Sequence, residues 1–129
     1  MKNEELKAIC CGNFSSYILL RDGKLLVWGR GGYGELGLGH YNNVSVPTLL
    51  MKDQIREITC GGSYLFILKQ NGTLMGTGSN EYGQLGFPDL QKRNTPTVLM
   101  VDPNIKTVIC GYSHSAIQKN NGELFIFGW

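Results

Sequence analysis

The stretch from Trp28 to Gly37, WGRGGYGELG, contains the residue types of a phosphate-binding loop, because Gly29 to Gly34 fit the pattern G-x-G-x-x-G. In a dinucleotide site this pattern joins a strand to a helix whose N-terminus faces the pyrophosphate. Two further glycines follow within Glu35 to Gly39, and glycine disfavours a helix. The sequence therefore predicts a glycine-rich turn, and no cofactor or cofactor-binding residue is assigned.

Three cysteines could supply metal ligands or disulfides. Cys11, Cys60 and Cys110 are each followed by glycine and lie 49 and 50 residues apart. Zinc sites draw on close pairs such as C-x-x-C, which this sequence lacks. We expect all three to be buried and reduced, with no metal among them. Cys10 should point to the opposite face of its strand from Cys11.

A Ser-His-Ser run centred on His114 has the residue types of a nucleophile and its base. Adjacent strand residues project to opposite faces, so His114 could not activate Ser115 within a strand. His40 is expected in a surface loop. The carboxylates are dispersed, and Glu35 aligns with Gln84, a poor replacement for a general acid. We therefore assign no catalytic or metal residue, and we predict that the chain is not an enzyme in itself.

Composition excludes several protein classes. Hydrophobic residues make up 42% of the chain and charged residues 17%, which is not a disordered composition. The net charge is +2, and the one basic pair, Lys92-Arg93, is expected at a solvated loop tip, so nucleic-acid or chromatin binding is not supported. No apolar run approaches the roughly 20 residues of a membrane span, and the start lacks the apolar centre of a signal peptide. An intracellular location, cytoplasmic or nuclear, is expected.

The glycine-rich stretch is one part of an internal repeat. A shift of 49 residues places Tyr33-Gly34 on Tyr82-Gly83, and Cys-Gly and Pro-Thr pairs match as well. The second copy has Asn80 where Gly31 stands, which breaks the phosphate-loop pattern. One residue is inserted near Pro103 before the third copy. We expect one partial domain over 1–129, with repeats over approximately 5–53, 54–103 and 104–129, the last of them truncated.

Each repeat predicts a small antiparallel sheet. In the first repeat KAICCG, SSYILLR and KLLVWG are strand-like segments, and SVPTLL is a fourth. Proline cannot donate to a strand ladder, so this fourth strand is expected at the sheet edge. Asp22-Gly23, Asn71-Gly72 and Asn121-Gly122 lie between the second and third strands, and they predict two-residue type I′ hairpins with glycine at positive φ. Four strands in about 50 residues are typical of a propeller blade.

The order of these motifs resembles the repeats of the regulator of chromosome condensation family. The first repeat carries them at Ile9, Cys11-Gly12, Asp22-Gly23, Leu25, Trp28-Gly29, Tyr33 to Gly37, and Pro47. The family's His-Ser pair is kept as His114-Ser115, and the resemblance gives this histidine a structural hydrogen-bonding role near the inner strand. The resemblance implies an all-β fold of four-stranded antiparallel propeller blades. Two blades and three strands of a third are expected here, as part of a ring of about seven blades.

Two functions follow from the resemblance. The first is a non-catalytic scaffold for protein partners, such as a small GTPase or a ubiquitin-pathway component. The variable segments His40–Ser45, Asp89–Asn94 and Asp102–Asn104 are its candidate binding loops. The alternative is a guanine-nucleotide exchange factor for a Ran-like small GTPase. The open blade faces imply either further blades in a longer protein or other copies of the chain that complete the ring, and no membrane partner is expected.

Overall fold

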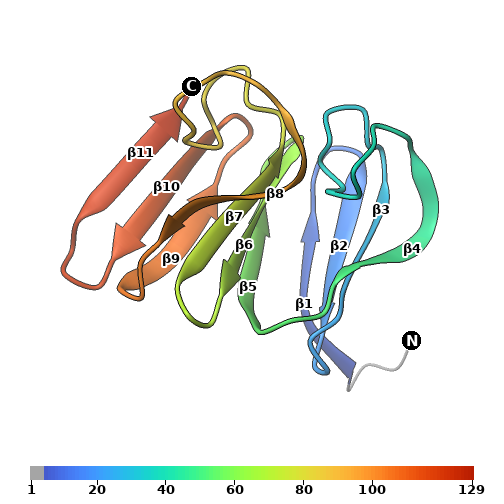
Figure 1. Cartoon of the computed structure of the whole chain (residues 1–129), viewed down its shortest axis with the longest axis horizontal. Helices are drawn as coiled ribbons and strands as arrows, with labels where there is room; N and C mark the ends of the chain where they lie inside the picture. Colours follow the sequence, from blue (N-terminus) through green and yellow to red (C-terminus); the bar gives the residue numbers. More distant parts are fainter. Residues whose placement is uncertain (1–4) are drawn as a thin grey trace.

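A computed structural model describes residues 5–129 as three antiparallel β-sheets that stand side by side (Figure 1). We call them blades 1, 2 and 3. Blade 1 consists of β1 (Leu6–Cys11), β2 (Ser15–Leu20), β3 (Leu25–Gly29) and β4 (Val44–Met51). Blade 2 consists of β5 (Ile55–Cys60), β6 (Tyr64–Lys69), β7 (Thr73–Gly78) and β8 (Arg93–Val101). Blade 3 consists of β9 (Ile105–Cys110), β10 (His114–Lys119) and β11 (Leu124–Gly128).

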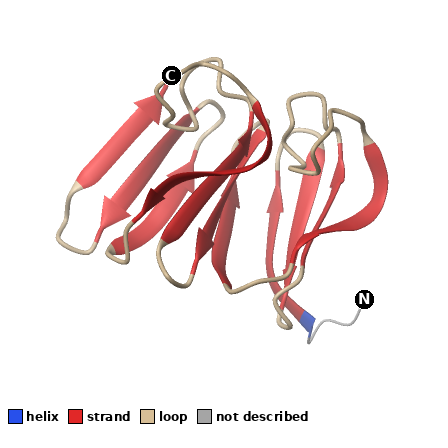
Figure 2. Ribbon diagram, in the orientation of Figure 1, coloured by secondary structure: helices blue, strands red, loops and turns tan. Residues whose placement is uncertain are grey.

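Within each blade the strands pair in chain order, so every sheet is a meander. The prolines of the fourth strands, Pro47 in β4 and Pro96 in β8, both lie on the outermost strand of their sheet, as expected. No helix among residues 5–129 is long and apolar enough to cross a bilayer, and Figure 2 shows strands and loops almost throughout. The predicted all-β partial propeller is confirmed.

The hairpins differ from the predicted type I′ turns. Gly23 has φ 95° as expected, but Asp22 is not at positive φ. The amide of Gly23 donates to the carbonyl of Leu20 at 3.0 Å, and the amide of Leu20 donates to the carbonyl of Lys24 at 2.9 Å. These bonds describe a three-residue loop, a type I turn closed by a left-handed glycine. The Asp22 carboxylate accepts the amide of Lys24 at 3.1 Å, which favours this form.

Most of the core lies between blades rather than inside one sheet. One buried cluster joins Tyr17 and Val27 of blade 1 to Ile58 and Ile67 of blade 2. A second cluster joins Phe66 of blade 2 to blade 3. Blade 2 therefore buries one face against blade 1 and the other against blade 3, which is the arrangement of a repeat array.

The loops at the two ends of the strands form two distinct faces. The hairpins between the second and third strands lie on one face, which we call the hairpin face. The loops 12–14, 30–43, 61–63, 79–92 and 111–113 lie on the opposite face, which we call the loop face (Figure 1). The loop face carries the residues discussed next.

Candidate interaction surface on the loop face

The glycine-rich stretch forms a chain of tight turns and no phosphate-binding helix. The amide of Gly34 donates to the carbonyl of Gly31 at 2.9 Å, and the amide of Gly37 donates to that of Gly34 at 3.0 Å. A Cβ at Gly31 would collide with the carbonyl oxygen of Asn42, so glycine is required there by close backbone packing. The stretch builds a rigid loop above blade 1.

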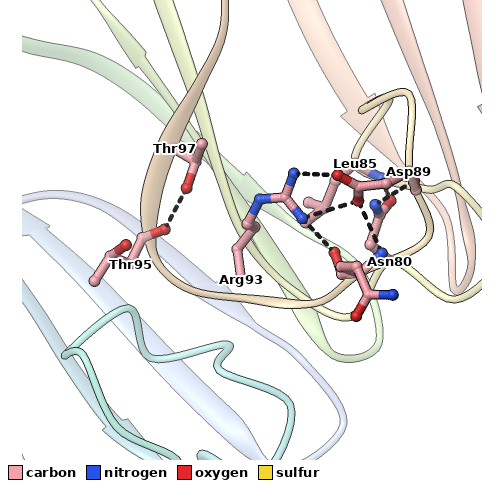
Figure 3. Close-up of polar contacts among 7 residues, drawn as sticks. Asn80, Leu85, Asp89, Arg93, Thr95 and Thr97 are labelled. Atoms are coloured by element: carbon pink, nitrogen blue, oxygen red, sulfur yellow. Dashed lines mark hydrogen bonds and ion pairs between the residues drawn. The ribbon is translucent and has the colours of Figure 1, made fainter.

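The equivalent loop of blade 2 is held by side chains instead. Asn80, which replaces Gly31, is fully buried, accepts the amide of Leu85 at 3.0 Å and donates to the carbonyl of Asp89 at 3.0 Å (Figure 3). Arg93 binds both carboxylate oxygens of Asp89, at 3.0 and 2.9 Å, and lies over the ring of Phe87. The Arg93 guanidinium lowers the pKa of Asp89. The expectation of a solvated Lys92-Arg93 pair is therefore wrong for Arg93, which closes this loop.

Six exposed aromatic residues lie on the loop face. Trp129 stacks on Tyr82 with ring centroids 5.1 Å apart. Arg30 lies 4.4 Å from the centroid of the Phe14 ring. The full set is Phe14, Tyr33, Tyr41, Tyr82, Tyr112 and Trp129. An apolar group of this kind on one face of a folded chain is typical of a binding surface.

Two hollows that are equivalent in the repeat open between these aromatic residues. The first, of about 390 Å³, lies between blades 1 and 2 and is lined by Phe14, Arg30, Tyr33, Glu35 and Tyr112 among others. We call it the loop-face hollow. The second, of about 60 Å³, has Ser63, Ser79, Tyr82 and Gln84 at the positions of Phe14, Arg30, Tyr33 and Glu35. The two hollows share their architecture, but the first has the charged Arg30 and Glu35 where the second has the neutral Ser79 and Gln84, and the second is also lined by Glu81.

Glu35 is the buried acid of the loop-face hollow. Glu35 is only 4% exposed, and its Oε1 accepts a hydrogen bond from the amide of Tyr33 at 2.8 Å. Burial raises the pKa of the Glu35 carboxyl above its ordinary value, against the opposing influence of the backbone amides and Arg30. In the sequence, the alignment of Glu35 with Gln84 served only as evidence against a general acid. Its other meaning, that the first repeat has a charged side chain where the second has a neutral amide, was missed.

Replacing Glu35 by glutamine is expected to raise the melting temperature at pH 7. The amide can keep the bond from Tyr33, as Gln84 keeps the bond from Tyr82 at 3.0 Å, and it removes a buried charge. The pKa of Glu35 is higher in the folded than in the unfolded chain, so below about the unfolded pKa the carboxyl is protonated in both states and does not destabilise the fold. As the pH rises through the folded pKa the buried carboxyl ionises, and the folded chain loses stability. The difference between variant and wild type should therefore grow as the pH rises above about 4.5. Thermal melts over a pH series measure it, and a Glu35→Gln protein that melts lower at pH 7 would contradict the cost of the charge.

The cysteines are only partly in the predicted state. All four thiols are free, but Cys11 is exposed, and Cys60 and Cys110 are half-buried. The pKa of Cys60 is raised by the neighbouring thiol of Cys10, in the preceding blade. Burial raises the pKa of Cys110 to about 11, next to Thr59 of its own preceding blade. The prediction of burial is therefore wrong for Cys11, because within residues 5–129 no blade stands on its outward side.

Cys11 is expected to react with a thiol reagent much faster than Cys110. The thiolate is the reactive form, Cys11 is exposed, and burial raises the pKa of the half-buried Cys110. Timed labelling followed by peptide mass spectrometry assigns each rate. Equal rates at the two residues would contradict this ranking.

The side chains of His114 and Ser115 lie apart, as expected for adjacent residues of a strand. His114 is exposed and Ser115 is fully buried, so they lie on opposite sides of β10. No side-chain hydrogen bond of His114 is found within residues 5–129, which corrects the role implied by the resemblance. Ser115 supplies the structural bond instead, donating to the carbonyl of Gln84 at 2.7 Å. The Tyr64 hydroxyl of blade 2 lies within hydrogen-bond distance of the carbonyls of Gly111 and His114 in blade 3, and its single proton is shared between them.

Among the residues that the structure describes, neither His40 nor the carboxylates form a recognisable reaction centre. His40 lies in the loop before β4, as expected, and its Nδ1 accepts the amide of Asn42 at 3.1 Å. Within residues 5–129 no group of three histidine, cysteine or acidic residues has the arrangement of a metal site.

Comparison with known proteins places this architecture in a family. The repeat profile of the regulator of chromosome condensation (RCC1) matches residues 22–68 and 71–118, and a second RCC1 repeat profile matches 6–35 and 55–84. The Arabidopsis thaliana protein named RCC1 domain-containing protein RUG3, mitochondrial, is 40% identical over 48 residues, which are 37% of this chain and 11% of that protein.

Solved structures agree with the sequence profiles. Human WBSCR16 superposes with a TM-score of 0.84 at 28% identity, over 100% of this chain and 35% of its own. Prp20p of Saccharomyces cerevisiae, a yeast RCC1, superposes with a TM-score of 0.84 at 27% identity, over 96% of this chain and 33% of its own. The chain thus spans about a third of the solved relatives. It belongs to the regulator of chromosome condensation (RCC1) repeat family.

Proposed function

We propose that the chain is a protein-interaction scaffold that binds its partner through the loop face and performs no covalent chemistry. The observation that carries the proposal is the set of exposed aromatic residues on loops fixed by rigid blades. Aromatic side chains are enriched at protein interfaces because they bury much area at low entropic cost. A small GTPase or a ubiquitin-pathway component is a candidate partner. An intracellular location remains a prediction, and the named plant relative is mitochondrial.

Site-specific photo-crosslinking tests the scaffold proposal. A benzophenone amino acid in place of Tyr112 on the loop face should capture one discrete partner from an extract of the source cells. The matched control replaces Asn121, which is exposed on the hairpin face, and should not capture that partner. Phe14→Ala should reduce the yield of the crosslink, because Phe14 and Tyr112 contact the same partner in this proposal. Capture of the same partner from both faces, or of none from either, would overturn the proposal.

A guanine-nucleotide exchange factor is the second candidate. It is favoured by the similarity to Prp20p, whose structure was described together with its binding properties to Gsp1p and histones. An exchange factor needs no cofactor, because it acts by binding the nucleotide-free GTPase more tightly than the loaded form. Release of a fluorescent nucleotide from a panel of small GTPases, with and without the chain, tests this function. Release rates that do not change for any GTPase would remove the exchange candidate and leave the scaffold.

A further inference from the structure

The loop-face hollow differs from its counterpart between blades 2 and 3 by a buried carboxylate, because Glu35 stands where the counterpart has Gln84, whereas the acid of the counterpart, Glu81, is exposed. In the counterpart, Gln84 accepts the amide of Tyr82 and donates to the hydroxyl of Ser79 at 3.2 Å, so both ends of its amide are bonded. In the loop-face hollow Arg30 replaces Ser79, but it lies over Phe14 and forms no ion pair with Glu35. Within residues 5–129 no side chain donates a hydrogen bond to the Glu35 carboxylate.

This arrangement costs stability that the fold does not require. Burying a carboxylate that has no direct ion pair lowers the stability of the fold. The neutral side-chain amide of Gln84 accepts the equivalent backbone hydrogen bond without burying a charge. The Glu35 residue is 4% exposed yet lines a hollow of about 390 Å³. Arg30 and Lys92 act on this carboxylate only without direct contact, so a direct ion pair with Glu35 requires a further cation in the hollow.

The walls of the hollow are suited to a cation. Phe14, Tyr33 and Tyr112 line it, and aromatic ring faces attract ammonium and guanidinium groups. Arg30 already lies 4.4 Å from the centroid of the Phe14 ring, so this wall holds a guanidinium within the chain itself. Asn13 donates to the Tyr112 hydroxyl at 2.9 Å, which fixes the ring of Tyr112 across the blade boundary.

We propose that the loop-face hollow receives a lysine or arginine side chain of a protein partner, with the Glu35 carboxylate as its counter-ion and Phe14, Tyr33 and Tyr112 as its walls. The inference rests on the proposed scaffold function and names the chemistry that the partner presents. Arg30 has a like charge at the rim and limits the affinity, because it competes for the Phe14 ring.

The test is a titration of the isotopically labelled chain with the pentapeptides Gly-Gly-Arg-Gly-Gly and Gly-Gly-Lys-Gly-Gly, followed by amide chemical shifts. Shifts should centre on Tyr33, Glu35 and Tyr112, with Kd values of about 1 mM, as is usual for one anchor. Glu35→Gln should weaken binding at least about tenfold, since the counter-ion is lost. Arg30→Ser should strengthen it. Both variants carry the residue that the second repeat has at that position, so the fold accepts them, and their spectra report folding directly.

A Glu35→Gln protein that binds as well as wild type would overturn the inference, and so would the absence of any shift. Binding of Gly-Gly-Glu-Gly-Gly that Arg30→Ser abolishes would show an anion site instead and would also overturn it. The scaffold proposal has a separate readout. If the Tyr112 crosslink to a partner persists unchanged in Glu35→Gln, the scaffold stands and the cation hollow fails.

Discussion

Replacing Gly72 by valine is expected to lower the melting temperature well beyond the effect of the same change at Gly122. Both glycines have φ 91°, where a β-branched residue is strained by about 1–2 kcal/mol. At Gly72 a Cβ would also lie 2.5 Å from the carbonyl carbon of Asp102 and 2.6 Å from the nitrogen of Pro103. At Gly122 no atom lies within 4 Å of the added Cβ. Gly122→Val therefore measures the backbone strain of a β-branched residue at positive φ alone, and Gly72→Val measures the same strain together with a collision against the backbone.

The collision has no inexpensive relief. Asp102 and Pro103 belong to the link between β8 and β9, and the amide of Asp102 donates to the carbonyl of Gly72 at 3.0 Å. Movement of this link breaks that bond and shifts blade 3 against blade 2. Overpacking of this kind costs about a further 1–3 kcal/mol, which corresponds to roughly 4–12 °C for a chain of this size. Melts at equal protein concentration measure the difference, and equal losses at the two glycines would show that the link yields freely.

The elements of the blades could be predicted because their signals are local. Alternating strands, an Asp-Gly or Asn-Gly turn and a proline on the fourth strand each act within a few residues. The predicted turn type was wrong because an Asp-Gly pair such as Asp22-Gly23 is compatible with both a two-residue type I′ loop and a three-residue loop. The strand register and the bond from Lys24 to the Asp22 carboxylate select the three-residue form.

Burial of the repeated cysteines depends on the neighbouring blade, which local sequence patterns do not report. Cys60 is partly covered because Cys10 of the preceding blade lies against it, while Cys11 has no such neighbour within the described residues. Glu35 and Arg30 replace Gln84 and Ser79 together in one repeat. That paired exchange was a usable signal, but its meaning required the geometry that brings both positions to one hollow.

The chain is expected to associate in solution, head to tail, through its two outer blade faces. Leu124 of β11 is 57% exposed, whereas the equivalent Leu25 and Leu74 are fully buried by the following blade. On the other outer face Ile9 is 59% exposed, whereas the equivalent Ile58 and Val108 are 8% and 5% exposed. Each exposed residue therefore marks a face that the repeat covers elsewhere with another blade.

These faces are complementary because the blade interfaces within the chain join the same two kinds of surface. The Ile58 side of blade 2 packs on blade 1, so the Ile9 side of one copy fits the Leu124 side of another. Such an interface is heterologous, and it forms a closed ring or an open filament according to its rotation. Light scattering with size-exclusion chromatography should give a mass above the 14.3 kDa of one chain, increasing with concentration. Leu124→Glu should shift the chain toward the monomer, since it buries an unpaired charge in the interface, while Glu123→Gln on the adjacent exposed turn should not. A soluble monomer that persists at high concentration would contradict the argument that these two faces are interfaces.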